Sequence, residues 1–132
     1  MRIVTEPEFA TRLAGLLADP VYEQAGWVTG PGRSGAVAAV YASHILHIPF
    51  VPYGQQAGRL GRVLIVDTAA ESGATMRKAV RRYQAYDPLE CVAFLEPPRV
   101  AFWYEAPKPQ RYRHEDFKRW RGAGGDQLAK DA

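Results

Sequence analysis

The chain has 132 residues, of which 47% are hydrophobic, and its 17 Lys and Arg residues against 14 Asp and Glu residues give a formal net charge of +3. This length fits one domain, and the apolar fraction together with the low net charge excludes a disordered chain. The single cysteine, Cys91, excludes a disulfide framework and a cysteine-based zinc site. These features predict a small protein of the reducing cytoplasm.

Two basic zones stand out in this nearly neutral sequence. Residues 24–66 contain no Asp or Glu, and residues 108–121 are mainly basic. This distribution favours an anionic ligand over general binding of nucleic acid. The sequence begins without an apolar signal core, and its most apolar stretch, residues 36–51, is shorter than the roughly 20 residues of a membrane span. No membrane partner is expected.

The first half of the chain alternates helix and strand signals. Thr5 and Glu8 form the pattern of a capping box, which predicts a helix that begins here and ends before Pro20. The apolar residues expected on one face of this helix are Phe9, Leu13, Leu16 and Leu17. A short strand is predicted at residues 27–29. A helix is predicted from residue 35 to about residue 47, with Ser34 as its cap.

The second half continues the alternation. A strand is predicted at residues 50–53, and the aliphatic run at residues 63–66 is typical of a strand buried on both faces. A helix is predicted from about residue 73 to residue 86. Two further strands are predicted at residues 89–95 and 100–104.

This order of elements predicts an α/β fold, with a Rossmann-like parallel β-sheet flanked by helices. In such sheets, ligands bind at the carboxyl ends of the strands. We expect residues 1–121 to form a single domain. The Gly-rich, polar residues 122–132 are expected to be a flexible tail.

The turn GPGRSG, residues 30–35, joins a predicted strand to a predicted helix and matches the G-x-G-x-x-G pattern of dinucleotide-binding proteins. That pattern also needs an acid about 20 residues further on to bind the ribose, and here none occurs before Asp67. We therefore interpret the turn as an anion cradle at a helix N-terminus, with Arg33 as its positive partner. In the alternative interpretation, its glycines serve backbone geometry alone.

The turn after the aliphatic strand carries a stronger signal. Asp67 lies at the carboxyl end of that strand, and the hydroxyls of Ser72 and Thr75 flank Gly73 where a helix begins. Hydroxyls and unpaired N–H groups at a helix N-terminus predict a site for a phosphate monoester, and Asp67 beside it is suited to bind sugar hydroxyls. The turn is not a P-loop, because no G-K-[S/T] occurs. In the alternative interpretation, Ser72 caps an ordinary helix.

Two segments carry a family resemblance. VLIVDTAAESGATM resembles the phosphoribosyl-pyrophosphate motif of type I phosphoribosyltransferases, and GPGRSGAVAAVYASHILHIPF resembles their pyrophosphate loop and helix; together they cover roughly residues 27–80. The resemblance implies a Rossmann-like sheet with a minimal base-binding hood. It also implies transfer of ribose 5-phosphate from phosphoribosyl pyrophosphate to a nucleobase, with release of pyrophosphate in the presence of Mg²⁺. A homodimer is a further expectation from this family.

The resemblance assigns a role to each matching residue. Asp67 and Thr68 would bind the ribose hydroxyls, and Asp67 would also contact Mg²⁺. The turn that would hold the 5′-phosphate consists of Ala70, Glu71, Ser72, Gly73, Ala74 and Thr75. The loop that would line the pyrophosphate site consists of Arg33, Ser34 and Gly35. Because carboxylates stabilise the oxocarbenium-like state of such displacements, Asp67 and Glu71 are the candidate catalytic residues.

Glu71 favours a purine as the acceptor. Purine-type members of the family carry an acid at this position near the imidazole ring of the base, where it moves a proton. The alternative is an exposed loop carboxylate. After the last predicted strand, Trp103 is the candidate for stacking on the base, and the alternative for its ring is packing in the core.

Two departures from the family pattern leave another class of function open. Thr68 stands where the family usually has a second acid, and only residues 54–61 are available for the mobile loop that closes over the site in many members. A non-catalytic module that senses nucleotides or phosphoribosyl pyrophosphate, or binds RNA, is therefore the alternative to the enzyme. A dinucleotide-dependent oxidoreductase is a third reading, and it lacks the required acid.

Overall fold

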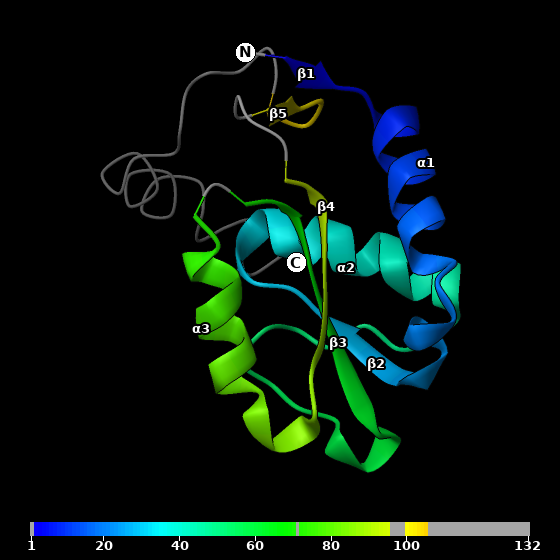
Figure 1. The fold of residues 1–132 in the computed structure, drawn as a ribbon, viewed down its shortest axis with the longest axis vertical. Helices are drawn as coiled ribbons and strands as arrows, with labels where there is room; N and C mark the ends of the chain where they lie inside the picture. Colours follow the sequence, from blue (N-terminus) through cyan, green and yellow to red (C-terminus); the bar gives the residue numbers. More distant parts are fainter. Residues whose placement is uncertain (1, 71, 96–99, 106–132) are drawn as a thin grey trace, which may run out of the picture.

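The computed structural model describes residues 2–70, 72–95 and 100–105. The segments of regular structure, in chain order, are β1 (Ile3–Val4), α1 (Glu6–Leu17), the short 3-10 helix η1 (Pro20–Gln24), β2 (Ala25–Thr29), α2 (Gly32–Leu46), η2 (Gly58–Leu60), β3 (Arg62–Ala69), α3 (Ala74–Arg82), η3 (Gln84–Tyr86), β4 (Leu89–Phe94) and β5 (Ala101–Phe102). Figure 1 shows their arrangement.

The central sheet is parallel, as the sequence predicts. Its order is β2-β3-β4, with Thr29 opposite Ile65 and Asp67 opposite Val92. The aliphatic run at residues 63–66 lies in β3, and those four residues are fully buried. The predicted α/β fold with a parallel sheet flanked by helices is confirmed.

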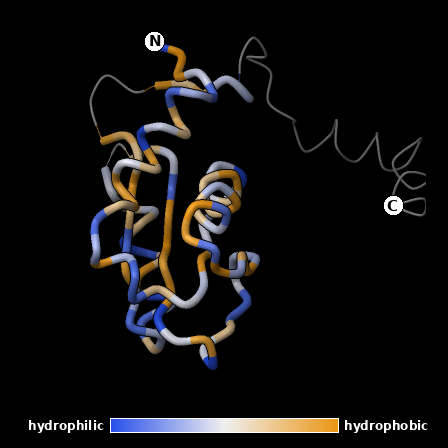
Figure 2. The backbone as a smooth tube through the Cα atoms, turned by 90° about the vertical axis from the view of Figure 1, so that its right-hand side faces the viewer, coloured by the Kyte–Doolittle hydropathy of each residue, from blue (hydrophilic) through white to orange (hydrophobic). Residues whose placement is uncertain are grey.

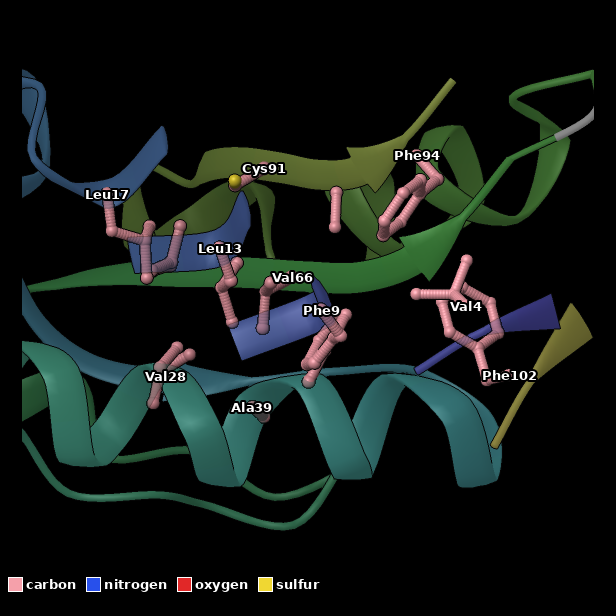
Figure 3. Close-up of a cluster of buried hydrophobic side chains, with 14 of the residues drawn as sticks. Val4, Phe9, Leu13, Leu17, Val28, Ala39, Val66, Cys91, Phe94 and Phe102 are labelled. Atoms are coloured by element: carbon pink, nitrogen blue, oxygen red, sulfur yellow. The ribbon is translucent and has the colours of Figure 1, made fainter. Parts of the chain in front are cut away.

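The two faces of the sheet follow the alternation of side chains along β3. Leu64 and Val66 face a core cluster formed with α1 and α2, whereas Val63 and Ile65 face a second cluster formed with α3. Figure 3 shows the first cluster, in which Phe9 of α1 lies between Val66 and Ala39 of α2. Figure 2 shows hydrophobic stretches along the strands at the centre of the molecule. The molecule therefore has three layers, with the sheet in the middle.

The first helix begins where the capping pattern predicts. The side chain of Thr5 accepts a hydrogen bond from the N–H of Glu8, and α1 ends at Leu17. The prediction that Leu16 belongs to the buried face is wrong, because 39% of this residue is exposed. Phe9, Leu13 and Leu17 are buried, as expected from their spacing of four residues.

The predicted strand at residues 50–53 is reduced to a single bridge. Phe50 is paired with Val28 of β2, through one hydrogen bond from Val28 N–H to Pro49 O and one from Val51 N–H to Val28 O. Pro52 has no N–H with which to extend the pairing, and the chain turns away at Gly54. No helix in the described part of the chain has the length and hydrophobicity to cross a membrane.

A second, two-stranded sheet was not predicted. It consists of β1 and β5, which pair in parallel, with Val4 opposite Phe102. Figure 1 shows this pair beyond the carboxyl end of β4. The residues of the predicted strand 100–104 that follow β5 form a turn, closed by a hydrogen bond from Glu105 N–H to Phe102 O.

Candidate active site

The polar residues of the candidate site lie where β3 ends. Asp67 and Thr68 are buried, and the side chain of Asp67 accepts a hydrogen bond of 2.8 Å from the N–H of Thr68. Asp67 is in phase with Ile65, and Thr68 is in phase with Val66. Asp67 is therefore on the α3 side of the sheet and Thr68 on the α2 side.

Burial makes the Asp67 carboxyl group a weaker acid. It raises the pKa of this carboxyl group from 3.8 to about 6, although hydrogen bonds from the backbone and side chain of Thr68 oppose the shift. Asp67 is therefore mostly ionised near neutral pH, but its negative charge is poorly solvated. A cation or the hydroxyl groups of a ligand would stabilise that charge.

The first of the two helix-opening turns, residues 30–35, packs tightly against the end of β3. A Cβ atom added at Gly30 would lie 2.1 Å from the carbonyl oxygen of Gly35 and 2.6 Å from that of Val66. Such approaches are possible only for glycine, because backbone atoms cannot move aside. The glycines of this turn thus bring the N-terminus of α2 against the strand that carries Asp67.

The helix that follows starts earlier than the sequence predicts. It begins at Gly32 after Pro31, so Ser34 lies within its first turn, and the prediction that Ser34 caps this helix is wrong. No side chain caps this helix N-terminus. Instead the Ser34 hydroxyl lies 2.6 Å from the hydroxyl of Tyr104. Gly35 is buried, whereas Arg33 is exposed at the first turn.

The second helix-opening turn, between β3 and α3, places the hydroxyls of Ser72 and Thr75 at the beginning of α3. Gly73 has a φ of 81° and precedes the helix, and the Ser72 hydroxyl accepts a hydrogen bond of 3.3 Å from the N–H of Ala74. Ser72, Ala74 and Thr75 are exposed. Glu71 lies outside the described residues. The helix ends at Arg82 rather than at the predicted residue 86, because residues 84–86 form the separate turn η3.

Arg77 is a cation that the motif alone does not identify. Its Nη1 donates a hydrogen bond of 3.1 Å to the carbonyl oxygen of Ser72, so the guanidinium lies over the second turn. Each of the two turns therefore has an arginine beside it, Arg33 at the first and Arg77 at the second. The position of Arg77 one helical turn after Gly73 is the sequence signal for this contact.

The aromatic residues after β5 divide between core and site. Trp103 packs against the rings of Phe9 and Tyr41, at centroid distances of 5.7 and 6.2 Å, so its ring contacts residues of α1 and α2. Tyr104 is the ring that reaches the first turn. The Arg33 guanidinium lies 6.0 Å from the centroid of the Tyr104 ring. Stacking of Trp103 on a base stays a prediction.

The candidate site offers few metal ligands of its own. Within residues 2–70, 72–95 and 100–105, no cluster of three or more His, Cys, Asp or Glu side chains is placed to hold a metal ion. Among the described residues of the site, Asp67 provides a buried carboxylate at the strand end. A Mg²⁺ ion commonly uses one or two carboxylates and takes its other ligands from substrate phosphates and water.

Comparisons with known proteins identify the fold. Neither a family model nor a curated protein matches the sequence. Among solved structures, the chain is similar to the xanthine-guanine-hypoxanthine phosphoribosyltransferase of Helicobacter pylori, with a TM-score of 0.61 and 14% identity over 92% of this chain and 98% of that chain. The chain has a type I phosphoribosyltransferase fold.

Two further structures share this phosphoribosyltransferase-like architecture. A purine phosphoribosyltransferase from Pyrococcus horikoshii has a TM-score of 0.57 and 22% identity, over 84% of this chain and 99% of that chain. A hypothetical protein from Neisseria gonorrhoeae with bound ppGpp has a TM-score of 0.61 and 15% identity, over 93% of this chain and 97% of that chain. These likenesses confirm the fold that the two sequence motifs imply.

Proposed function

We propose that this protein transfers ribose 5-phosphate from phosphoribosyl pyrophosphate to a purine base and releases pyrophosphate. The observation that carries the proposal is the buried carboxylate of Asp67, which lies at the end of β3 where two helix-opening turns follow strands of a parallel sheet. One turn has Arg33 beside it and the other has Arg77. A sugar with a phosphate group at one end and a pyrophosphate group at the other would suit an acid that lies near two helix-opening turns with an arginine beside each.

Different residues would bind the phosphate, the pyrophosphate and the ribose of the substrate. The 5′-phosphate would bind the hydroxyls of Ser72 and Thr75, and the pyrophosphate would bind the N-terminus of α2 beside Arg33. Asp67 would hold the ribose hydroxyls and, with the oxygens of the substrate, a Mg²⁺ ion. That ion would neutralise the pyrophosphate as it leaves. The negative charge of Asp67 would then stabilise the positive charge that develops on the ribose ring.

The assignment of a purine rests on two observations. Glu71, in the second turn, is suited to move a proton at the imidazole ring of a purine. Two of the solved structures with this fold are purine enzymes by name. Glu71 is therefore the proposed acid or base, and Asp67 is the proposed electrostatic partner of the ribose.

A second candidate function is a nucleotide sensor that binds without catalysis. Thr68 supports it, because this position carries no charge where the resembled enzymes have a second acid. The Neisseria structure supports it as well, since a protein of this fold was found there with bound ppGpp. The two candidates share the phosphate site and differ in whether a bond to the anomeric carbon is broken.

One experiment separates them. Phosphoribosyl pyrophosphate with Mg²⁺ and, separately, ppGpp are titrated into the protein by calorimetry, and pyrophosphate release is then measured with a panel of purine and pyrimidine bases. We expect phosphoribosyl pyrophosphate to bind and a purine to trigger release. If either ligand binds but no base triggers the release of pyrophosphate, the sensor is favoured. If neither ligand binds, both functions are contradicted.

Removing both hydroxyls of the second turn tests the phosphate site directly. Ser72→Ala with Thr75→Ala is expected to weaken binding of phosphoribosyl pyrophosphate by about 100-fold, because each hydroxyl loses a hydrogen bond to a charged phosphate. Both residues are exposed, so circular dichroism should show an unchanged fold. Ser43→Ala is the matched control, since the Ser43 hydroxyl bonds Val40 O near the other end of α2. Unchanged affinity in the double variant would contradict the phosphate assignment.

A further inference from the structure

The hydroxyl of Tyr104 links the segment after β5 to the first of the two turns of the candidate site. It lies 2.6 Å from the Ser34 hydroxyl in the first turn of α2. Burial raises the pKa of Tyr104, and the hydrogen bond with the Ser34 side chain opposes part of this shift. The negative charges of Glu105 and Asp67 add to the increase. Tyr104 therefore keeps its proton near neutral pH, and its hydroxyl contacts the first turn of α2.

Contacts with its sequence neighbours fix the position of the Tyr104 ring. Its ring stacks on the ring of Phe102 at 5.8 Å and 13°, and meets the Trp103 ring edge-on at 5.1 Å. The N–H of Phe102 donates a hydrogen bond of 3.0 Å to the Glu105 carboxylate, which closes the turn that holds Tyr104. Because the ring is held by these contacts, its hydroxyl can restrain the side chain it bonds.

The neutral residue at position 68 fits this arrangement. Thr68 is on the α2 side of the sheet, in phase with Val66, and Tyr104 packs against the core cluster on that same side. An acid at position 68 would place a second buried negative charge beside Asp67, on the side of the sheet that Tyr104 faces. The neutral threonine thus leaves the Tyr104 hydroxyl to its contact with Ser34.

We propose that Tyr104 is a positioning residue, which holds Ser34 and the first turn of α2 in the conformation that binds pyrophosphate. This inference rests on the proposed function, since it assigns the pyrophosphate to that turn. Tyr104 acts through Ser34 and takes no part in breaking or forming a bond of the substrate. Its effect is on the affinity of the first turn for an anion.

The test uses variants that remove single hydroxyl groups. Tyr104→Phe, Ser34→Ala and the double variant are compared by calorimetric titration with inorganic pyrophosphate and Mg²⁺. We expect Tyr104→Phe to weaken pyrophosphate binding about fivefold, as suits the loss of one neutral hydrogen bond. We expect the double variant to bind no more weakly than Ser34→Ala alone, because the tyrosine acts through the serine.

Tyr41→Phe is the matched control. The Tyr41 hydroxyl also forms a side-chain hydrogen bond of 2.6 Å, to Glu6 in α1, away from the first turn of α2. Each tyrosine variant should lower the melting temperature, and only Tyr104→Phe should change the affinity for pyrophosphate. A purely structural role of the Tyr104 hydroxyl would change the melting temperature alone.

The possible outcomes separate this inference from the proposed function. If the unmodified protein binds pyrophosphate and Tyr104→Phe binds it equally well, the role of Tyr104 is refuted and the proposed function stands. If losses in the single variants add in the double variant, Tyr104 and Ser34 act independently, which also overturns the inference. If the unmodified protein does not bind pyrophosphate, the proposed function and the role of Tyr104 are both refuted.

Discussion

Asp67→Asn is expected to make the protein more stable at pH 8 and to abolish most of its activity. Burial raises the pKa of Asp67 to about 6, so keeping this group ionised opposes folding above that pH. An asparagine carries no charge and can still accept the hydrogen bond from Thr68 N–H. We expect the free energy of unfolding at pH 8 to rise by about 2 to 3 kcal/mol.

The size of this stabilisation depends on pH, within a window set by the unfolded and folded pKa values of Asp67. Below about pH 3, Asp67 is protonated in the folded and the unfolded chain, so the variant and the unmodified protein should be equally stable. The difference should grow between about pH 3 and pH 7, across the range that separates the unfolded from the folded pKa, and stay constant above. Urea denaturation at about pH 3 and pH 8 measures both limits.

The proposed activity should fall in Asp67→Asn, whereas stability rises. Without the carboxylate, the developing charge on the ribose loses its partner, and we expect pyrophosphate release to slow by about a factor of 1,000. Asp19→Asn is the control, because Asp19 caps η1 at the surface and asparagine can cap equally well. A variant that is less stable at pH 8, or that turns over normally, would contradict the role of Asp67 as a buried, functional acid.

Gly30→Ala is expected to destabilise the protein strongly. The added Cβ atom would meet the carbonyl oxygens of Gly35 and Val66 at 2.1 and 2.6 Å, both of them backbone atoms. The turn would have to separate from the end of β3, and we expect a loss of about 3 kcal/mol in the free energy of unfolding. Affinity for pyrophosphate should fall with it, since α2 would leave its place beside Asp67.

Gly15→Ala provides the comparison. Gly15 lies inside α1, and a Cβ atom there would meet nothing within 4 Å. Alanine should therefore stabilise the helix by about 0.5 to 1 kcal/mol. Equal stability of Gly30→Ala and the unmodified protein in urea denaturation would show that the first turn is not packed against β3 as described.

The central fold could be predicted because its signals are local. The aliphatic run of β3 specifies a strand buried on both faces, and the capping residue Thr5 specifies where α1 begins. The pairing of β1 with β5 could not be predicted, since two-residue strands have too short a pattern to show alternation. The prediction that Leu16 lies on the buried face of α1 is wrong, because the buried face of this helix is narrower than the run of leucines suggests.

The candidate site likewise contains residues that the sequence predicts and a contact that it does not. Asp67, Ser72 and Gly73 follow from the chemistry of a strand, a tight turn and a helix start, all of which are read along the chain. The partner of Ser34 does not, because Tyr104 is distant in sequence and reaches it only through the folded layers. For the same reason the sequence favours Ser34 as a helix cap, although its hydroxyl bonds a tyrosine instead.

The pairing of β1 with β5 has a consequence for synthesis on the ribosome. The strands β2, β3 and β4 and the helices between them are contiguous in the chain, so this layered core can assemble as soon as it has been made. β1 is synthesised before all of them, yet its partner β5 follows all of them. The N-terminal strand must therefore wait unpaired during translation, and Tyr104 reaches Ser34 only when this last, longest-range closure is made. A nascent chain that stops before β5 already contains both helix-opening turns but lacks the contact of Tyr104 with Ser34 in the first of them.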